Sequence, residues 1–382
     1  MTVRGQAVRR EEADIRAPAA EGSSSTASRL RAWLLVGLLL LVLLGISEGL
    51  SALAMFHLES RYRQASATVP FAELAWYHAR ELLTGKTRRH FSSEPSPLFV
   101  AHPTLGYTIA PGDYAIRIHD DMTDQDHVFR ARVLADGSRA TRAGESGDAG
   151  ADPRPKIYLF GDSWVWGWGN QDEHTIGWLL QGWLPDRDVR NFAQSGYGNV
   201  QALVQLREMA TSLRPDDVVV LGYGDFFDAR NVAAPSRLRE FRVDRDLQGG
   251  GAPLTHPRAS LLAGRVRIDG VDLAGEHPER DPDPHAMQDV TLGILAEVAE
   301  HVPGPVVLAY LEGPDESPVL SRAGALGFRV ADLRRRGPNE WDNFLPFDAH
   351  PGPLADFNMA DKLYRVLLPV AERQSVGTAS KR

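Results

Sequence analysis

The stretch YLFGDSWVWGWG, residues 158–169, decides the fold class. Its first three residues form an apolar run of the kind found in strands that are covered on both faces. Gly161 permits a sharp turn of the backbone, and Ser163 then stands where the next element begins. This order of strand, turn and serine is typical of a displayed nucleophile at the edge of a sheet.

The chain beyond residue 156 alternates short apolar runs with helical patterns. Strands are predicted at 157–160, 189–192, 217–221, 305–310 and 328–333, and helices at 174–183, 200–213, 287–301 and 354–372. This alternation predicts a three-layer α/β/α fold with a parallel five-stranded sheet and right-handed crossovers. The stretch 241–284 is rich in Gly, Pro and Asp, so we expect an insertion over the sheet. Ligands of such sheets bind beyond the carboxyl ends of the strands.

The composition excludes several classes of protein. The chain has 382 residues, of which 43% are hydrophobic, and this is enough for a sizeable core. Its net charge is −8, with 42 basic and 50 acidic residues spread along the chain, so no nucleic-acid partner is indicated. Cysteine is absent, which excludes disulfides, cysteine-ligated metals and thiol nucleophiles.

An apolar segment near the N-terminus predicts a membrane anchor. One helix over residues 32–54 would span roughly 30 Å of hydrocarbon. Six arginines precede it, so the positive-inside rule predicts a cytoplasmic N-terminus and a body that lies outside, in the periplasm or at the cell surface. A signal peptide cleaved after Ala54 and a buried core helix are the two alternatives.

The remaining parts of the chain flank the anchor and the α/β domain. Residues 1–31 are predicted to be a disordered cytoplasmic tail, 55–155 a stalk and a β-rich prelude, 156–373 the α/β domain and 374–382 a second tail. Within the prelude we expect a helical stalk over 59–86, followed by strands at 106–109, 114–118 and 128–133.

Three distant stretches of the sequence carry the residues that acyl-transfer chemistry needs. Ser163 follows the first strand of the α/β domain, Gly196 follows the second, and Asp348 and His350 precede the last helix. A serine hydroxyl becomes a good nucleophile when an imidazole held by a carboxylate takes its proton. The backbone amides of Ser163 and Gly196 are the natural donors for the oxyanion of the intermediate.

In these blocks the chain from 156 to about 372 resembles the SGNH/GDSL hydrolase family. The first block is Gly161-Asp162-Ser163, and the second places Gly196 between Asn191 and Gln201. The resemblance implies a Ser-His-Asp triad of Ser163, His350 and Asp348, although this chain has Asp-x-His where Asp-x-x-His is commonest. The membrane helix followed by a β-rich prelude is similar to that of membrane-linked bacterial members.

The third block departs from the family pattern. The family has Gly-x-Asn-Asp after the middle strand, and its Asn donates to the oxyanion, whereas this chain has Gly224 at that place. The neighbouring Asp225 only accepts hydrogen bonds when it is ionised, so it cannot replace the Asn. Either the side chain of Asn231 or that of Arg230 supplies the third donor to the oxyanion, or the oxyanion is bound by two donors only. We favour Asn231.

The three tryptophans behind the serine raise two interpretations. Trp164, Trp166 and Trp168 are too closely spaced for one helical face, so we expect them to divide between the core and the cleft. Rings beside Ser163 would exclude water and bind a sugar or a short acyl chain. All three could instead fill the core.

Other polar clusters carry weaker signals. Four residues could be arranged as a metal site: His277, Asp281, Asp283 and His285. They lie in the Pro-rich insertion, where such side chains are more often solvated. We therefore expect no metal and no cofactor.

These observations lead to a serine esterase with a membrane anchor as the expected function. By resemblance, its substrates would be acetyl or short acyl esters of envelope or extracellular carbohydrate or lipid. An O-acetyltransferase of envelope polysaccharide would use the same acyl-enzyme, with a sugar hydroxyl as acceptor instead of water. A non-catalytic carbohydrate-binding protein on the same scaffold is the third reading, because the Asn of the third block is missing.

Overall fold

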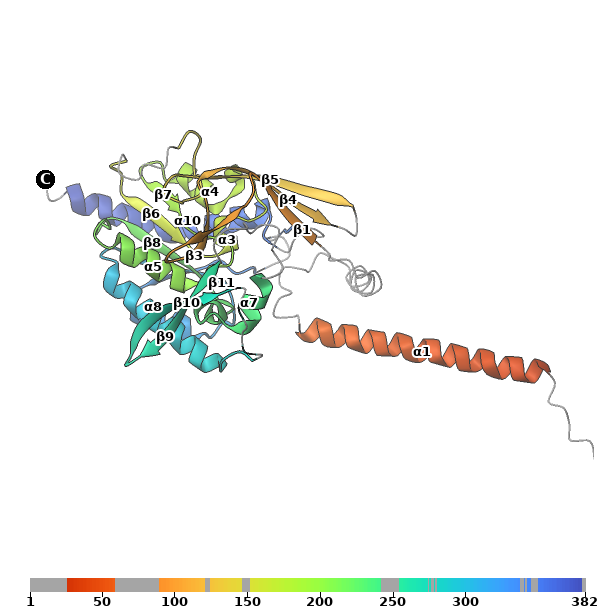
Figure 1. The fold of residues 1–382 in the computed structure, drawn as a ribbon. Coiled ribbons are helices and arrows are strands. Elements are labelled where there is room, and N and C mark those ends of the chain that lie inside the picture. The colour runs from red at the N-terminus through yellow and green to blue at the C-terminus, as the bar shows by residue number, and fades with distance from the viewer. Residues whose placement is uncertain are drawn as a thin grey trace, which may run out of the picture. The chain divides into compact units, whose positions relative to one another are not determined.

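The computed structural model describes residues 26–58, 89–120, 124–145, 152–241, 254–273, 275, 278, 280–336, 340, 342–344 and 350–379. The chain divides into two units, Met1–Glu59 and Ser60–Arg382 (Figure 1). The predicted stalk at 59–86 lies outside the described residues.

The first unit contains one long helix, α1 (Thr26–Leu58). Its stretch Trp33–Leu50 is long and apolar enough to cross a membrane, and none of it is buried. A signal sequence would satisfy the same criteria of length and composition. The helix begins at Thr26 rather than at residue 32 and therefore includes residues assigned to the tail, because Arg29 and Arg31 are good helix formers.

The centre of the second unit is a five-stranded parallel sheet, as predicted. Its order is β12-β11-β8-β6-β7, with β6 (Lys156–Phe160), β7 (Asp188–Asn191), β8 (Val218–Gly224), β11 (Val306–Glu312) and β12 (Arg329–Asp332). All residues of β6, β7 and β8 are buried, and β6 and β8 are mainly apolar as expected of strands covered on both faces. The polar side chains of β7 are instead hydrogen-bonded: Nε of Arg190 donates to Asp188 and Nδ2 of Asn191 to the carbonyl of Val165. The sheet thus fixes where the ends of β6, β7 and β8 lie.

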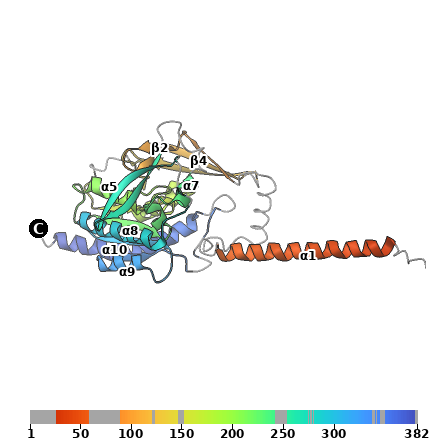
Figure 2. The same cartoon turned by 60° about the horizontal axis from the view of Figure 1, so that its bottom comes forward.

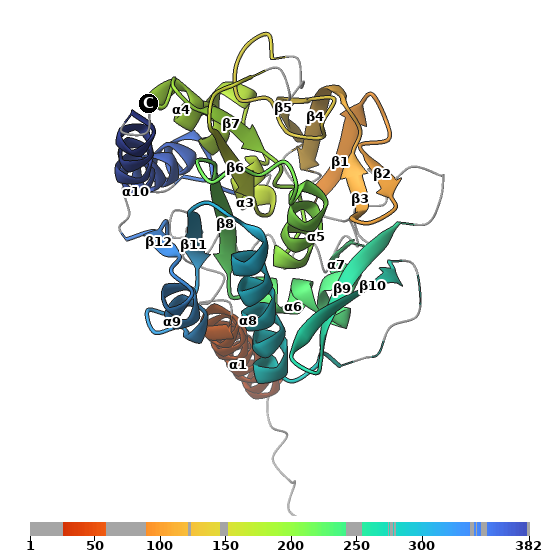
Figure 3. The same cartoon turned by 90° about the vertical axis from the view of Figure 1, so that its left-hand side faces the viewer.

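Helices cover both faces of this sheet. On one face, α4 (Ile176–Trp183) and α10 (Pro353–Ala379) pack against each other, and on the other α5 (Asn199–Met209) packs against α8 (Pro284–His301) (Figure 3). The short helices are α3 (Ser163–Trp166), η2 (Asp172–His174), α6 (Phe227–Asn231), α7 (Pro235–Phe241) and α9 (Pro318–Ala325). Because α10 continues to Ala379, most of the predicted second tail is helical.

The prelude forms strands of its own. A three-stranded antiparallel sheet has the order β1-β4-β5, from β1 (Arg89–Glu94), β4 (Gly112–Asp120) and β5 (Gln125–Val133). A separate hairpin pairs β2 (Phe99–His102) with β3 (Gly106–Ile109). The prelude and α10 lie on opposite sides of this unit (Figure 2). Arg139 joins the prelude to the parallel sheet, since it bridges Val133 and Asn191.

The insertion at 241–284 contains an antiparallel hairpin. Strands β9 (Thr255–Leu262) and β10 (Arg265–Asp272) pair with each other and not with the central sheet. The hairpin packs on α5, α6 and α8, and it also touches β3 of the prelude. A Cβ on Gly106, whose φ is +84°, would lie 2.1 Å from the carbonyl oxygen of Thr255, so the two hairpins meet with no room for a side chain.

Candidate active site

The structure brings Ser163 and His350 together. Nε2 of His350 lies 2.8 Å from Oγ of Ser163, although the two residues are 187 positions apart. Ser163 begins α3 directly after the turn that follows β6, and His350 precedes α10. This is the hydrogen bond through which an imidazole can take the proton of a serine hydroxyl.

Two glycines let the serine turn approach the neighbouring strand. A Cβ on Gly161 would lie 2.5 Å from Cγ2 of Val165, and a Cβ on Gly222 of β8 would lie 2.8 Å from the same atom. Either side chain would push α3 away from the sheet, because contacts this short do not occur between real side chains. The glycines therefore set the position of Ser163.

Asp162 fixes the start of α3 and is itself held by an arginine. Its carboxylate accepts the Trp164 amide at 3.0 Å and Nη1 of Arg230 at 2.8 Å. The Asp162 side chain is 1% exposed and that of Arg230 is 13% exposed, so the ion pair is shielded from water. Arg230 also donates to the carbonyl of Tyr197 at 3.2 Å, which ties the serine turn to the loop after β7.

The segment that carries His350 is fixed by Asn170. Nδ2 of Asn170 donates to the carbonyl of Pro351 at 3.1 Å and to the carboxyl group of Asp356 at 2.9 Å. Asp356 is fully buried, and burial raises its pKa well above the usual range. The ring of Trp168 lies beside the His350 ring, with centroids 6.1 Å apart. These contacts limit how far the imidazole can move from Ser163.

Asp348 lies outside the described residues, so its role as the triad carboxylate stays a prediction. It is separated from His350 by one residue only. A carboxylate at that place would orient the ring and stabilise its charged form.

Gly196 lies in the loop that follows β7, which we call the oxyanion loop and define as residues 194–198. Its φ is +78°, a conformation that favours glycine. Within the described ranges, no protein acceptor engages the amides of Ser163 or Gly196. Both amides are thus candidates to bind an oxyanion.

Asn231 has a structural position and does not serve as the third donor. Its Oδ1 accepts the Val200 amide at 3.0 Å, and its Nδ2 donates to Oγ1 of Thr291 at 2.8 Å. The residue is fully buried, and these bonds join α5, α6 and α8. A Cβ on Gly198 would lie 2.6 Å from its Oδ1, so Asn231 also restricts the oxyanion loop.

The place of the missing Asn is occupied by an aromatic ring. A Cβ on Gly224, the last residue of β8, would lie 2.6 Å from Cε1 of Phe226. The ring of Phe226 lies beneath the Arg230 guanidinium, 4.6 Å from its carbon to the ring centroid. An Asn at 224 would require this ring to move, which is a physical reason for the glycine.

The three tryptophans divide between the core and the surface. Trp166 is 1% exposed and lies under the guanidinium of Arg139, while Trp168 is 4% exposed and packs beside His350. Trp164 alone is partly exposed, next to Phe226 with ring centroids 6.3 Å apart. Of the three, Trp164 alone has an exposed part of its side chain.

Glu312 is a charged residue of this edge that the sequence pattern did not reveal. It ends β11, and its carbonyl accepts the amide of Asp225 at 3.2 Å. Burial, together with the charges of Asp225 and Asp162, raises the pKa of Glu312 to about 7. Its place at a strand end was the signal that could have identified it.

The cluster considered for a metal has other roles. Asp283 accepts the amides that begin α8, and Asp281 accepts the Ser236 amide at 2.8 Å. His277 lies outside the described residues. Across the described ranges, no group of three or more His, Asp or Glu side chains is arranged to hold a metal ion.

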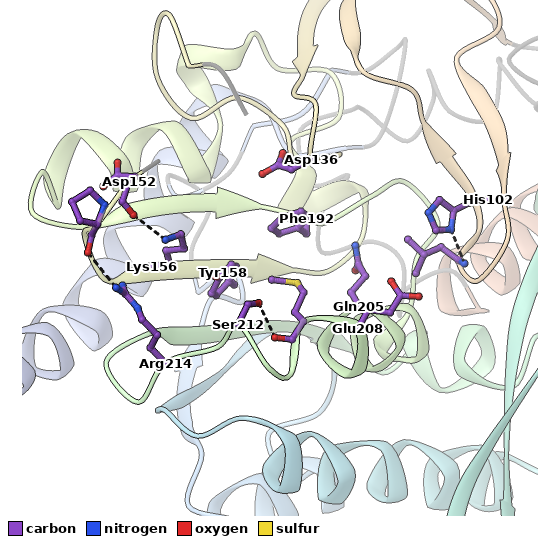
Figure 4. A pocket seen from close by; sticks show the side chains of 13 residues that line it. His102, Asp136, Asp152, Lys156, Tyr158, Phe192, Gln205, Glu208, Ser212 and Arg214 are labelled. Atoms are coloured by element: carbon purple, nitrogen blue, oxygen red, sulfur yellow. Dashed lines mark hydrogen bonds between the residues drawn. The ribbon is translucent and has the colours of Figure 1, made fainter. Parts of the chain in front are cut away.

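A separate cavity of about 580 Å³ runs along β6 and the second half of α5 (Figure 4). Tyr158 and Phe192 line it, together with Gln205 and the charged residues Lys156 and Arg214. Neither Ser163 nor His350 lines this cavity, so it is distinct from the serine site.

The solved structures that are similar to this chain include lipolytic proteins and esterases. A member of the lipolytic protein G-D-S-L family from Veillonella parvula is 13% identical, with a TM-score of 0.35, over 56% of this chain and 98% of its own. The protein TesA is 14% identical, with a TM-score of 0.35, over 56% of this chain and 99% of its own. The esterase EstA from a Pseudoalteromonas species is 15% identical, with a TM-score of 0.31, over 55% of this chain and 94% of its own.

No protein-family model matches the chain, and no curated protein matches it. Because the identities and TM-scores are low, we base the function on the geometry around Ser163.

Proposed function

We propose that this chain is a serine ester hydrolase of the G-D-S-L type, with Ser163 as nucleophile and His350 as general base. The observation that carries the proposal is the 2.8 Å contact between Oγ of Ser163 and Nε2 of His350 at the carboxyl edge of a parallel sheet. Acyl transfer needs this hydrogen bond, whereas a capping serine or a surface histidine does not.

The reaction follows from the positions of these groups. Ser163 attacks the ester carbonyl while His350 takes its proton, and the amides of Ser163 and Gly196 bind the oxyanion. His350 then returns the proton to the leaving alcohol. In the second half, His350 activates a water, and attack on the acyl-enzyme releases the acid. Asp348 would orient the imidazole throughout.

We propose acetyl or short acyl esters on envelope or extracellular carbohydrate or lipid as the substrates. Trp164 is partly exposed beside the serine turn and offers a ring on which a sugar or an acyl chain can pack. The stretch Trp33–Leu50 would anchor the chain in the membrane, with a cytoplasmic N-terminus and an extracytoplasmic body.

The test uses the full chain in detergent and aryl esters of increasing acyl length. We expect acetate to be hydrolysed fastest, and we expect Ser163→Ala to lower kcat at least a thousandfold. A variant of Ser195, which lies in the oxyanion loop but whose side chain has no role in the proposal, is the matched control: Ser195→Ala should retain most activity. Hydrolysis by Ser163→Ala at the wild-type rate would refute the proposal.

The same assay separates water from a sugar as acceptor. Addition of an oligosaccharide should leave the release of acetate unchanged for a hydrolase. For an O-acetyltransferase, the released acetate would fall while acetylated sugar accumulates.

A further inference from the structure

The oxyanion loop is held from outside the parallel sheet, on two sides. From the prelude, the Tyr107 hydroxyl donates to the carbonyl of Ser195 at 2.8 Å, and the Tyr197 hydroxyl donates to the carbonyl of Tyr107. The two rings meet edge to face at 5.5 Å, and both residues are 2% exposed. Residues of β3 therefore fix two positions that flank Gly196.

From the insertion, a chain of hydrogen bonds reaches the same loop. The Gly198 amide donates to Oε1 of Gln201 at 2.8 Å, and Nε2 of Gln201 lies 3.1 Å from Nε2 of His256. Nδ1 of His256 lies 2.8 Å from the carbonyl of Pro257. Gln201 and His256 are almost completely buried, so these hydrogen bonds are shielded from bulk water.

The chemistry of these partners fixes the direction of each bond. The Pro257 carbonyl only accepts, so Nδ1 of His256 carries the proton and Nε2 accepts from the Gln201 amide. Gln201 must then present its oxygen to the Gly198 N–H, as observed. Burial lowers the pKa of His256 to about 4, which keeps the ring neutral at neutral pH.

We propose that His256, in hairpin β9–β10, is a positioning residue that holds the Gly196 amide in place for the oxyanion. It acts through Gln201 and Gly198, two residues from Gly196, and its ring also lies within hydrogen-bonding range of the Gly196 backbone. Because Gly224 replaces the Asn donor of the third block and Asn231 is engaged elsewhere, the hole depends more heavily on the Gly196 amide. This inference rests on the proposed function, since it assigns a role within the same site.

The alternative is that His256 contributes to folding only. A purely structural residue would affect stability and all kinetic constants together, or none. A positioning residue affects kcat and not KM, because the oxyanion forms only in the transition state. His256→Leu removes the acceptor for Gln201, whereas His256→Gln retains a side-chain oxygen at about the same distance from the backbone.

The experiment measures aryl acetate hydrolysis by the full chain in detergent for both variants. We expect His256→Leu to lower kcat about tenfold with KM within about twofold, and His256→Gln to stay within about threefold of wild type. The matched control is His301→Gln at the end of α8, where Nδ1 also lies near a backbone carbonyl; it should leave both constants unchanged. Equal losses for His256→Leu and His256→Gln, or no loss for His256→Leu, would overturn the inference.

A second measurement is independent of activity. Hydrogen exchange of peptides that cover residues 194–198 should accelerate in His256→Leu and not in His256→Gln or His301→Gln. Unchanged exchange in His256→Leu would overturn the positioning role. If Ser163→Ala is as active as wild type, the proposed function fails, and the exchange measurement still decides whether His256 holds the loop.

Discussion

Arg230 donates to the carboxylate of Asp162, from Nη1 to Oδ2 over 2.8 Å, directly beside the serine nucleophile. The pair connects α6 with the turn that begins α3, and the same guanidinium reaches the carbonyl of Tyr197. Sequence reasoning considered Arg230 as an oxyanion donor. Its Nη1 instead binds groups that position Ser163 and the oxyanion loop.

Arg230→Met should destabilise the fold by about 3 kcal/mol, because it leaves the buried Asp162 carboxylate with the Trp164 amide as its remaining described partner. Urea unfolding measures this change in the free energy of unfolding. The control is Arg258→Met, which breaks an ion pair to Asp269 whose side chains are 49% and 47% exposed, and which should cost less than about 1 kcal/mol. If Arg230→Met and Arg258→Met lower the free energy of unfolding equally, the ion pair between Arg230 and Asp162 is not shielded from water.

The buried His256 should make stability depend on pH. Its pKa is about 4 in the folded chain and 6.5 when exposed, so the unfolded chain binds more protons between these values. The contribution is fully present above pH 6.5 and is lost as the pH falls from 6.5 to about 4, by up to about 3 kcal/mol. The curve of unfolding free energy against pH should be flatter for His256→Gln across this window. If the curves of unfolding free energy against pH run parallel for the wild type and His256→Gln, the lowered pKa of His256 would be contradicted.

Trp164 and Trp166 should respond differently to replacement by alanine. Trp164→Ala should raise KM for an acetylated oligosaccharide several-fold and change stability little, because this ring is partly exposed. Trp166→Ala should lower the free energy of unfolding by about 3 to 5 kcal/mol, since the ring is buried under Arg139. Steady-state kinetics and urea unfolding distinguish these outcomes, and a larger rise in KM for Trp166→Ala would contradict the assignment.

The sequence predicted the central sheet because its strands carry a strong local signal. Strands β6, β8 and β11 are short, mainly apolar runs, and the structure has all five strands within a few residues of the expected bounds. The hairpin β9–β10 was not predicted, since its strands lie in a Gly- and Pro-rich insertion and expose charged side chains such as Arg258, Arg267 and Asp269. Strand β10 does alternate, with Val266 and Ile268 between charged residues, but the Gly- and Pro-rich surroundings outweighed this signal.

The candidate site likewise contains residues that the sequence predicted and residues that it did not. Ser163 and His350 could be paired from sequence because strand ends of a parallel sheet converge at one edge. The roles of His256 and Asn231 could not be predicted, because each depends on contacts between elements that no motif and no shared sheet edge brings together. A lone histidine in a Gly- and Pro-rich stretch, such as His256, carries no local signal for such a contact.

Covalent labelling tests the pairing of Ser163 with His350 most directly. An aryl phosphonate should add one equivalent to the full chain, on Ser163, as read from the intact mass and the labelled peptide. His350→Ala should slow labelling at least a hundredfold at unchanged thermal stability. Labelling of folded His350→Ala at the wild-type rate, or modification at a residue other than Ser163, would contradict the account.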